Sequence, residues 1–218
     1  KTKDNSIFQL FPYVSSDYNN KDLYFIKKEK NLSIRKVKPK EVAKVLFKGE
    51  PIGRFSLNKG EFGPRALGNR SILADPRKQD ILNTINKKIK VRDFWMPFAP
   101  SIISEDAKKF LHIIKKHKST YMTISFDAKE YGRMNIPAAV HPFDKTARPQ
   151  IVYKNLNKEY YLLIKEFKKL SKVGALLNTS FNLHGEPIVE SPRDAFRTFK
   201  KSGLKYLYIG DFLIKKLS

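Results

Sequence analysis

The residues in this chain best suited to chemistry are arginines set among glycines between Glu61 and Arg92. The segment reads EFGPRALGNRSILADPRKQDILNTINKKIKVR, in a chain with many more lysines than arginines. A guanidinium is a planar fork of donors that binds a carboxylate or a phosphate through two hydrogen bonds, whereas a lysine ammonium is a flexible point charge. Gly60, Gly63 and Gly68 let the backbone turn sharply or come close to a ligand. The segment therefore predicts one wall of an anion-binding cleft.

Two further polar clusters stand where strands are predicted to end. The first cluster contains His141, Asp144, Thr146, Arg148 and Gln150, and the second contains Asn178, Thr179, Ser180 and Asn182. Ligands of open α/β sheets bind at strand ends, so we expect both clusters and the arginine segment to meet at one cleft.

Each cluster also has a purely structural interpretation, and the residues alone leave both open. Arg65 and Arg70 could tie loops to carboxylates instead of binding a ligand. Lys90 and Arg92 share a face only if the backbone between them is extended, and otherwise form a solvated helix end. Serine and asparagine in the second cluster could simply cap or turn the chain after the strand.

The histidines do not predict a metal site. His112 and His117 are five positions apart, whereas a zinc-binding pair on a helix is four apart. His141, beside Asp144 and Arg148, is the better candidate for chemistry, although a loop histidine more often forms a hydrogen-bonding wall. The sequence has neither a GxxxxGK[ST] nor a GxGxxG motif, so any nucleotide must be bound in another way.

The elements that must position these clusters follow from apolar spacing and capping residues. Strands are expected at residues 52–57, 98–103, 120–128, 147–153 and 175–181, with a hairpin around Gly210 and Asp211. Helices are expected from Pro39, Asp75, Ser104, Asn157 and Ser191. Residues 129–145 are expected to form a long loop. The alternation of strands and helices, closed by a hairpin, predicts an α/β sheet with some antiparallel pairing.

Composition limits the function classes. The chain has 218 residues, 41% of them hydrophobic, which is enough for a substantial core. It has no cysteine, which excludes disulfides and thiolate chemistry and fits a cytoplasmic location, and it has no apolar run that could cross a membrane. The formal net charge is +23. Because the lysines are dispersed, we interpret this charge as a solvated surface and do not expect nucleic acid as a partner.

The ordered motifs resemble a known family. They are EFGPRALGNRSILADPR, INKKIKVRDFWMPFAPSI, TARPQ, LLNTSFNLHGEPIV and IGDFLI. Together they look like the C-terminal region of the O-carbamoyltransferases of nodulation factors and antibiotics, from about Pro39 to Lys216. The resemblance implies a YrdC-like domain at residues 39–218, an α/β fold with a twisted mixed sheet and flanking helices around an open cleft. Residues 1–38 would then be the junction with a preceding partner domain of actin-like ATPase fold, which carries a metal and the acceptor site.

The same resemblance implies the chemistry. Such a domain takes carbamoyl phosphate and ATP, with Mg²⁺ arriving on the nucleotide, and forms carbamoyl adenylate, whose carbamoyl group the preceding domain moves to a hydroxyl. Full transfer is therefore not expected from this chain alone. The Lys-x-Arg and Ser-x-Asn pairs of YrdC-like proteins give the predicted catalytic residues Lys90, Arg92, Ser180 and Asn182. The predicted substrate-binding residues are Arg65, Arg70, His141, Arg148 and Asn178. No metal-binding residue is predicted.

Two other functions remain open at this level. A basic YrdC-like module that binds RNA would explain the charge and would show a steep salt dependence. A threonylcarbamoyl-adenylate synthase would share the fold, but the EFGPRALGNRS loop resembles the carbamoyltransferases and not that enzyme.

Overall fold

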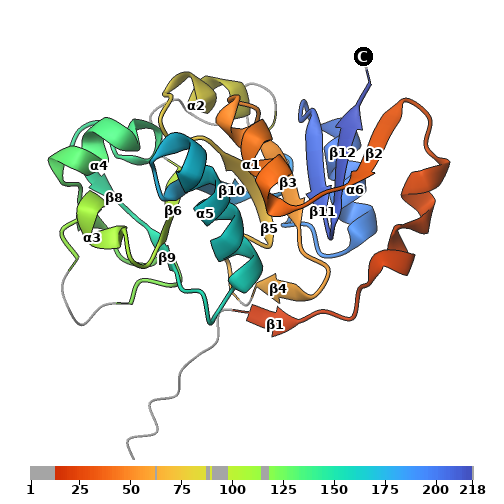
Figure 1. The fold of residues 1–218 in the computed structure, drawn as a ribbon, viewed down its shortest axis with the longest axis horizontal. Coiled ribbons are helices and arrows are strands. Elements are labelled where there is room, and N and C mark those ends of the chain that lie inside the picture. The colour runs from red at the N-terminus through yellow and green to blue at the C-terminus, as the bar shows by residue number, and fades with distance from the viewer. Residues whose placement is uncertain (1–12, 62, 87–88, 90–97, 114–117, 218) are drawn as a thin grey trace, which may run out of the picture.

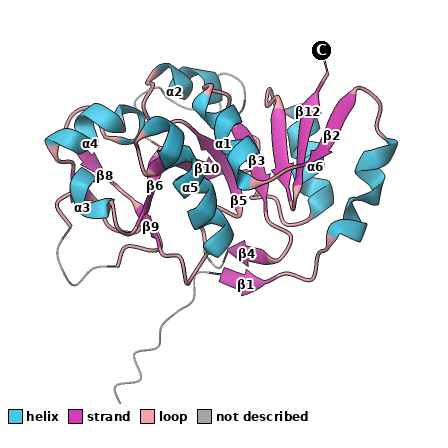
Figure 2. Cartoon of the chain, in the orientation of Figure 1, coloured by secondary structure: helices cyan, strands magenta, loops and turns pink. Residues whose placement is uncertain are grey.

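The computed structural model describes residues 13–61, 63–86, 89, 98–113 and 118–217, which form a mixed α/β fold around one large sheet (Figures 1 and 2). The strands of this sheet are β2 (Leu32–Lys36), β3 (Ile52–Phe55), β5 (Arg70–Ala74), β6 (Ala99–Ile103), β9 (Gln150–Val152), β10 (Ala175–Ser180), β11 (Tyr206–Ile209) and β12 (Phe212–Lys216). Their order is β2-β12-β11-β3-β5-β10-β6-β9. Neighbours are antiparallel except β11 with β3 and β6 with β9. The predicted α/β class with a mixed sheet is confirmed.

Two short ribbons border the large sheet. Strand β1 (Tyr13–Ser15) pairs antiparallel with β4 (Lys59–Glu61), and β7 (Phe126–Asp127) pairs antiparallel with β8 (Thr146–Ala147). In the first ribbon Tyr13 is the direct partner of Glu61. The beginning of the described chain therefore lies beside the arginine segment. Strand β2, also from the residues before position 39, forms an edge of the large sheet.

Helices α1 (Pro39–Phe47) and α5 (Lys158–Ser171) lie side by side over one face of the sheet (Figure 1). Their apolar residues form one core with Leu176 of β10. Each helix begins where capping chemistry favours it, because Pro39 occupies the first helical turn and Asn157 accepts a hydrogen bond from the Tyr160 amide. These two predicted helices are confirmed.

The opposite face carries a second core. It includes residues of α2 (Asp80–Ile85), α6 (Pro192–Lys201) and the 3-10 helix η1 (Asn20–Lys28), together with Leu177 of β10. Because side chains alternate along a strand, Leu176 and Leu177 point to opposite faces and join different cores. A third core joins α3 (Ala107–Phe110) to β6 and β9, and it includes Ile136 and Val140, which flank the 3-10 helix η3 (Pro137–Ala139) that follows α4 (Glu130–Asn135). None of the described helices is long and apolar enough to cross a membrane.

Several predicted elements differ from the structure, among them the helix expected from Ser104, which begins at Ala107. The helix expected from Asp75 begins at Asp80, and the Asp75 carboxylate instead accepts a hydrogen bond from the Arg77 amide at 3.0 Å within a turn. The strand expected at residues 120–128 is reduced to Phe126–Asp127, since Met122 adopts a left-handed φ of 57° that interrupts an extended chain. The long loop expected at residues 129–145 contains α4 and η3.

Candidate anion-binding site

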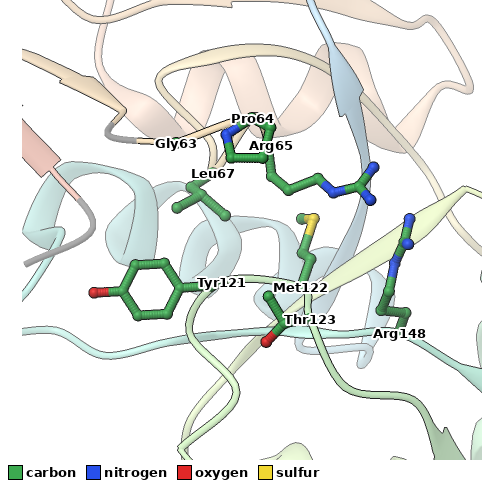
Figure 3. Close-up of a pocket in the computed structure, with 8 residues that line it drawn as sticks. All are labelled: Gly63, Pro64, Arg65, Leu67, Tyr121, Met122, Thr123 and Arg148. Carbon is green, nitrogen blue, oxygen red and sulfur yellow. The ribbon is translucent and has the colours of Figure 1, made fainter. Parts of the chain in front are cut away.

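The arginine segment borders a pocket of about 450 Å³ (Figure 3). Its lining residues are Gly63, Pro64, Arg65, Leu67, Tyr121, Met122, Thr123 and Arg148. A narrower space of about 80 Å³ shares four of these residues and reaches the end of β10 at Asn178, Thr179 and Ser180. The two spaces therefore form one cleft. It brings together residues from all three polar clusters that the sequence singled out.

Arg65 and Arg148 supply the positive charge of the cleft. Figure 3 shows their guanidinium groups extending toward each other, with Met122 beside them. Desolvation, and then the positive charge of Arg65, lower the pKa of Arg148. Among the described residues neither arginine forms an ion pair, so no described carboxylate neutralises them. Two exposed guanidinium forks that repel each other favour an anion between them.

Ser180 and Asn182 form one hydrogen-bonded unit. The Ser180 hydroxyl donates to Asn182 Oδ1 at 2.8 Å, and Asn182 Nδ2 donates to the Glu186 carbonyl at 2.5 Å. The loop that follows β10 therefore holds Asn182, and Asn182 orients the hydroxyl of Ser180. Ser180 lines the narrow end of the cleft, whereas Asn182 stands behind it.

Glu61 shapes the loop that carries Arg65. One carboxylate oxygen, Oε1, accepts three backbone N–H bonds, from Leu67 at 2.9 Å, Asn69 at 2.6 Å and Arg70 at 2.9 Å. Burial raises the pKa of Glu61, while the bonds to the loop amides oppose that shift. Sequence reasoning did not identify this role. The available signal was a lone acid at the start of a glycine-rich segment.

Arg70 does not line the pocket. It is 3% exposed, and its guanidinium donates to the carbonyls of Ser56 at 2.5 Å and Lys59 at 3.1 Å. It also lies 3.6 Å from the centroid of the Phe55 ring. Desolvation by burial lowers its pKa to about 10. This geometry fits the structural interpretation of Arg70, because its side chain is buried away from the cleft and its Nη1 atom bonds to protein carbonyls.

Asn178 ties the arginine loop to the sheet. Its Nδ2 atom lies 3.2 Å from the Ala66 carbonyl, 3.0 Å from Ser101 Oγ and 3.3 Å from Gln150 Oε1. Its Oδ1 atom is buried and has no hydrogen-bond partner among the described residues. Since Asn178 is 2% exposed, it contributes mainly to the rigidity of the cleft floor.

Of the remaining predicted residues, the structure describes His141, which is not brought into the cleft. His141 lies in the turn between η3 and β8, with Nδ1 3.2 Å from Asp144 Oδ1, and is absent from the described lining. Lys90 and Arg92 lie outside the residues that the structure describes, so their place in the site stays a prediction. Across the described part of the chain, no group of three or more histidine or acidic side chains is arranged to hold a metal ion.

Curated relatives share sequence with this chain, and solved structures share its fold. The nodulation protein NolNO of Sinorhizobium fredii is 45% identical over 159 residues, which are 72% of this chain and 23% of that protein. Full-length HypF, in its phosphate- and nucleotide-bound form, matches with a TM-score of 0.53 at 19% identity, over 85% of this chain and 22% of HypF. Sua5 of P. abyssi matches with a TM-score of 0.50 at 13% identity, over 79% of this chain and 45% of Sua5. These two structural likenesses establish the YrdC-like fold and nothing further.

The chain spans between 23% and 31% of the length of the first three curated relatives. The family model described as Carbamoyltransferase C-terminus matches residues 43–216. That match covers most of the 218 residues, including the arginine loop, β10 and the closing hairpin. The chain therefore belongs to the carbamoyltransferase C-terminal family.

Proposed function

We propose that this domain forms carbamoyl adenylate from carbamoyl phosphate and ATP, and that a preceding domain moves the carbamoyl group to a hydroxyl. The observation that carries the proposal is the pair Arg65 and Arg148. Both reach into one cleft, no described carboxylate neutralises them, and the cleft ends at Ser180. An anion of the size of carbamoyl phosphate suits this arrangement. Family membership supports the transferase class.

The overall reaction sets what the cleft must do. Carbamoyl phosphate, ATP and one water give carbamoyl adenylate, phosphate and pyrophosphate. The water is consumed when carbamoyl phosphate is cleaved to carbamate and phosphate. The carbamoyl–phosphate bond breaks with release of phosphate, and a carbamate oxygen then bonds to the α-phosphorus as the bond to the β-phosphate breaks. Two anions must approach each other, and fixed cations in a shielded cleft lower their repulsion.

Each cleft residue has a role in this scheme. Arg65 and Arg148 bind the phosphate of carbamoyl phosphate and stabilise the charge of phosphate as it leaves. Ser180, oriented by Asn182, positions the carbamoyl group or the phosphate next to it. Lys90 and Arg92 remain the predicted ligands of the triphosphate.

The described lining of the cleft contains no carboxylate. The lining therefore suits a Mg²⁺ that is bound chiefly to nucleotide phosphate oxygens. When bound there, the ion would neutralise phosphate charge, and the arginines would provide the remaining positive field.

The test is the exchange of labelled pyrophosphate into ATP in the presence of carbamoyl phosphate. Arg65→Ala, Arg148→Ala and Ser180→Ala should each reduce the exchange, the arginine variants by roughly 10-fold to 100-fold because each loses a charge-assisted contact. Arg35→Ala is the matched control, since Arg35 lies exposed on the edge strand β2 and does not line the cleft. Unchanged exchange in all three cleft variants would disprove the assignment. Salt-sensitive binding of RNA by a chain without exchange activity would favour the RNA-binding alternative.

A further inference from the structure

One hydrogen-bonded node joins three distant segments beneath the cleft. The Leu67 carbonyl accepts from the Tyr13 hydroxyl at 2.9 Å and from Gln150 Nε2 at 2.7 Å. Gln150 Nε2 also donates to the Tyr13 hydroxyl at 2.9 Å. The two amide hydrogens of Gln150 and the hydroxyl hydrogen of Tyr13 are all used, so the node fixes three groups relative to one another.

The node lies close in sequence to both cleft arginines. Arg65 is two residues before Leu67, and Arg148 is two residues before Gln150. Two peptide units allow little independent movement, so displacement of Leu67 or Gln150 carries the neighbouring arginine with it. The bond between Gln150 and Leu67 therefore couples the two arginines, which otherwise repel each other.

The same network reaches the other wall of the cleft. Gln150 Oε1 accepts from Ser101 Oγ at 2.7 Å and lies 3.3 Å from Asn178 Nδ2. Asn178 stands two residues before Ser180 on β10, and alternation along a strand places their side chains on one face. Gln150 is thus the central residue of a buried network that supports the segments carrying Arg65, Arg148 and Ser180.

Tyr13 is the member of this network that comes from outside the family match. It belongs to β1, whereas the match begins at residue 43. Its position is set by the pairing of β1 with β4, in which Tyr13 is opposite Glu61. Burial raises the pKa of the Tyr13 hydroxyl, which keeps the hydroxyl protonated and able to donate to Leu67.

We propose that Tyr13 is a positioning residue of the anion cleft. Its hydroxyl holds the Leu67 carbonyl and Gln150 together, and thereby sets the separation of Arg65 and Arg148. Anion affinity then depends on the docking of strand β1, a segment that precedes the region shared with the family. The inference rests on the proposed function in one respect, because it assumes that the two arginines bind the substrate anion.

The experiment measures binding by calorimetry with phosphonoacetamide, the stable analogue of carbamoyl phosphate in which a methylene replaces the bridging oxygen. Tyr13→Phe keeps the ring and removes only the hydroxyl, and should weaken binding by between about 2-fold and about 10-fold, the range expected for one neutral hydrogen bond. Tyr24→Phe is the matched control. Tyr24 lies in η1 of the same N-terminal part, and its hydroxyl accepts from Arg193 at 3.0 Å, away from the cleft. This control should bind the analogue like the unmodified chain.

Two further measurements separate positioning from general stability. Thermal unfolding should show Tyr13→Phe fully folded at the assay temperature, with a Tm a few degrees below that of Tyr24→Phe because a buried hydrogen bond is lost. The KM for carbamoyl phosphate should rise more than kcat falls. In an Arg65→Ala background the added effect of Tyr13→Phe on binding should shrink, because one of the two groups that Tyr13 positions is then absent.

Equal binding by Tyr13→Phe and the unmodified chain would overturn the inference, as would an equal loss in Tyr24→Phe or an undiminished loss in the Arg65→Ala background. Pyrophosphate exchange decides the proposed function separately. If the chain lacks exchange activity but shows the predicted ratios of binding affinity, the proposed reaction is refuted and the positioning role of Tyr13 still holds.

Discussion

Replacing Arg148 with glutamine should weaken anion binding without destabilising the protein. The side chain of Arg148 is exposed, has no ion-pair partner among the described residues, and lies within the positive field of Arg65. Glutamine keeps a polar side chain of moderate length and removes the charge. The folded protein then loses a repulsion, while a bound anion loses an attraction, so stability and affinity are expected to change in opposite directions.

The magnitudes follow from the exposure of the two guanidinium groups. Interactions between exposed charges are worth about 0–1 kcal/mol because solvent screens them. For a domain of this size, 1 kcal/mol corresponds to a shift of about 2–4 °C in Tm, so Arg148→Gln should raise Tm by at most about 4 °C. A charge-assisted hydrogen bond to the anion contributes about 1.5–3 kcal/mol, which predicts a loss of roughly 10-fold to 100-fold in affinity.

The assay combines thermal unfolding at low and high ionic strength with calorimetric titration of phosphonoacetamide. The gain in Tm should shrink at high ionic strength, since salt already screens the repulsion. Arg35→Gln, on the exposed edge strand, should leave the affinity unchanged and serves as the control for loss of one positive charge. A fall of several degrees in Tm, or an unchanged affinity in Arg148→Gln, would show that Arg148 is a structural residue and not part of an anion site.

Four other variants test how the cleft is built. Gly68→Ala should destabilise the fold by about 3 kcal/mol or more in chemical unfolding, because φ is +108° and a Cβ atom would lie 2.3 Å from the Tyr160 ring. Gly63 has a similar φ of +107° but open space around it, so Gly63→Ala should cost about 1 kcal/mol. A similar cost in both glycine variants would contradict this difference. Asn178→Ala should lower stability by about 1–3 kcal/mol, measured in the same way, because it removes a buried donor from the loop and the sheet, and a loss near zero would count against that role. Burial raises the pKa of Glu61 above its ordinary value of 4.5, so the folded state binds this proton more tightly than the unfolded state. The stability that the protonated carboxyl contributes is therefore lost as pH rises from 4.5 through the folded pKa. Chemical unfolding across that range should show Glu61→Gln gaining stability relative to the unmodified chain as pH rises, and parallel pH profiles would exclude the effect.

Local chemistry predicted the elements whose signals are local. Helix α5 begins after Asn157 and α6 begins after Ser191, because each capping side chain bonds to a backbone amide within three residues. The closing hairpin around Gly210 follows from a tight turn between two apolar strands. The ordered motifs, which depend on residue identity along the chain, were enough to predict the family.

Local patterns failed where a distant partner decides the conformation. The strand predicted at residues 120–128 is interrupted by the left-handed Met122, whose side chain forms a wall of the cleft. The loop predicted at residues 129–145 contains α4, where Tyr131 packs edge-on against Phe110 at 5.1 Å between ring centroids. Neither the conformation of Met122 nor the contact between Tyr131 and Phe110 can be inferred from apolar spacing, because both depend on segments that meet only after folding.

The arginines illustrate the same division at the site. Residue type indicated an anion-binding segment, yet Arg65 and Arg70 are chemically identical and stand five positions apart. Arg65 faces the cleft, whereas Arg70 begins β5 and lies buried against Phe55 of the neighbouring strand. The bond between Tyr13 and Gln150 spans 137 positions in the sequence. Such partners are chosen by the pairing and register of strands, which arise from packing of the whole sheet and are encoded in no single stretch of the chain.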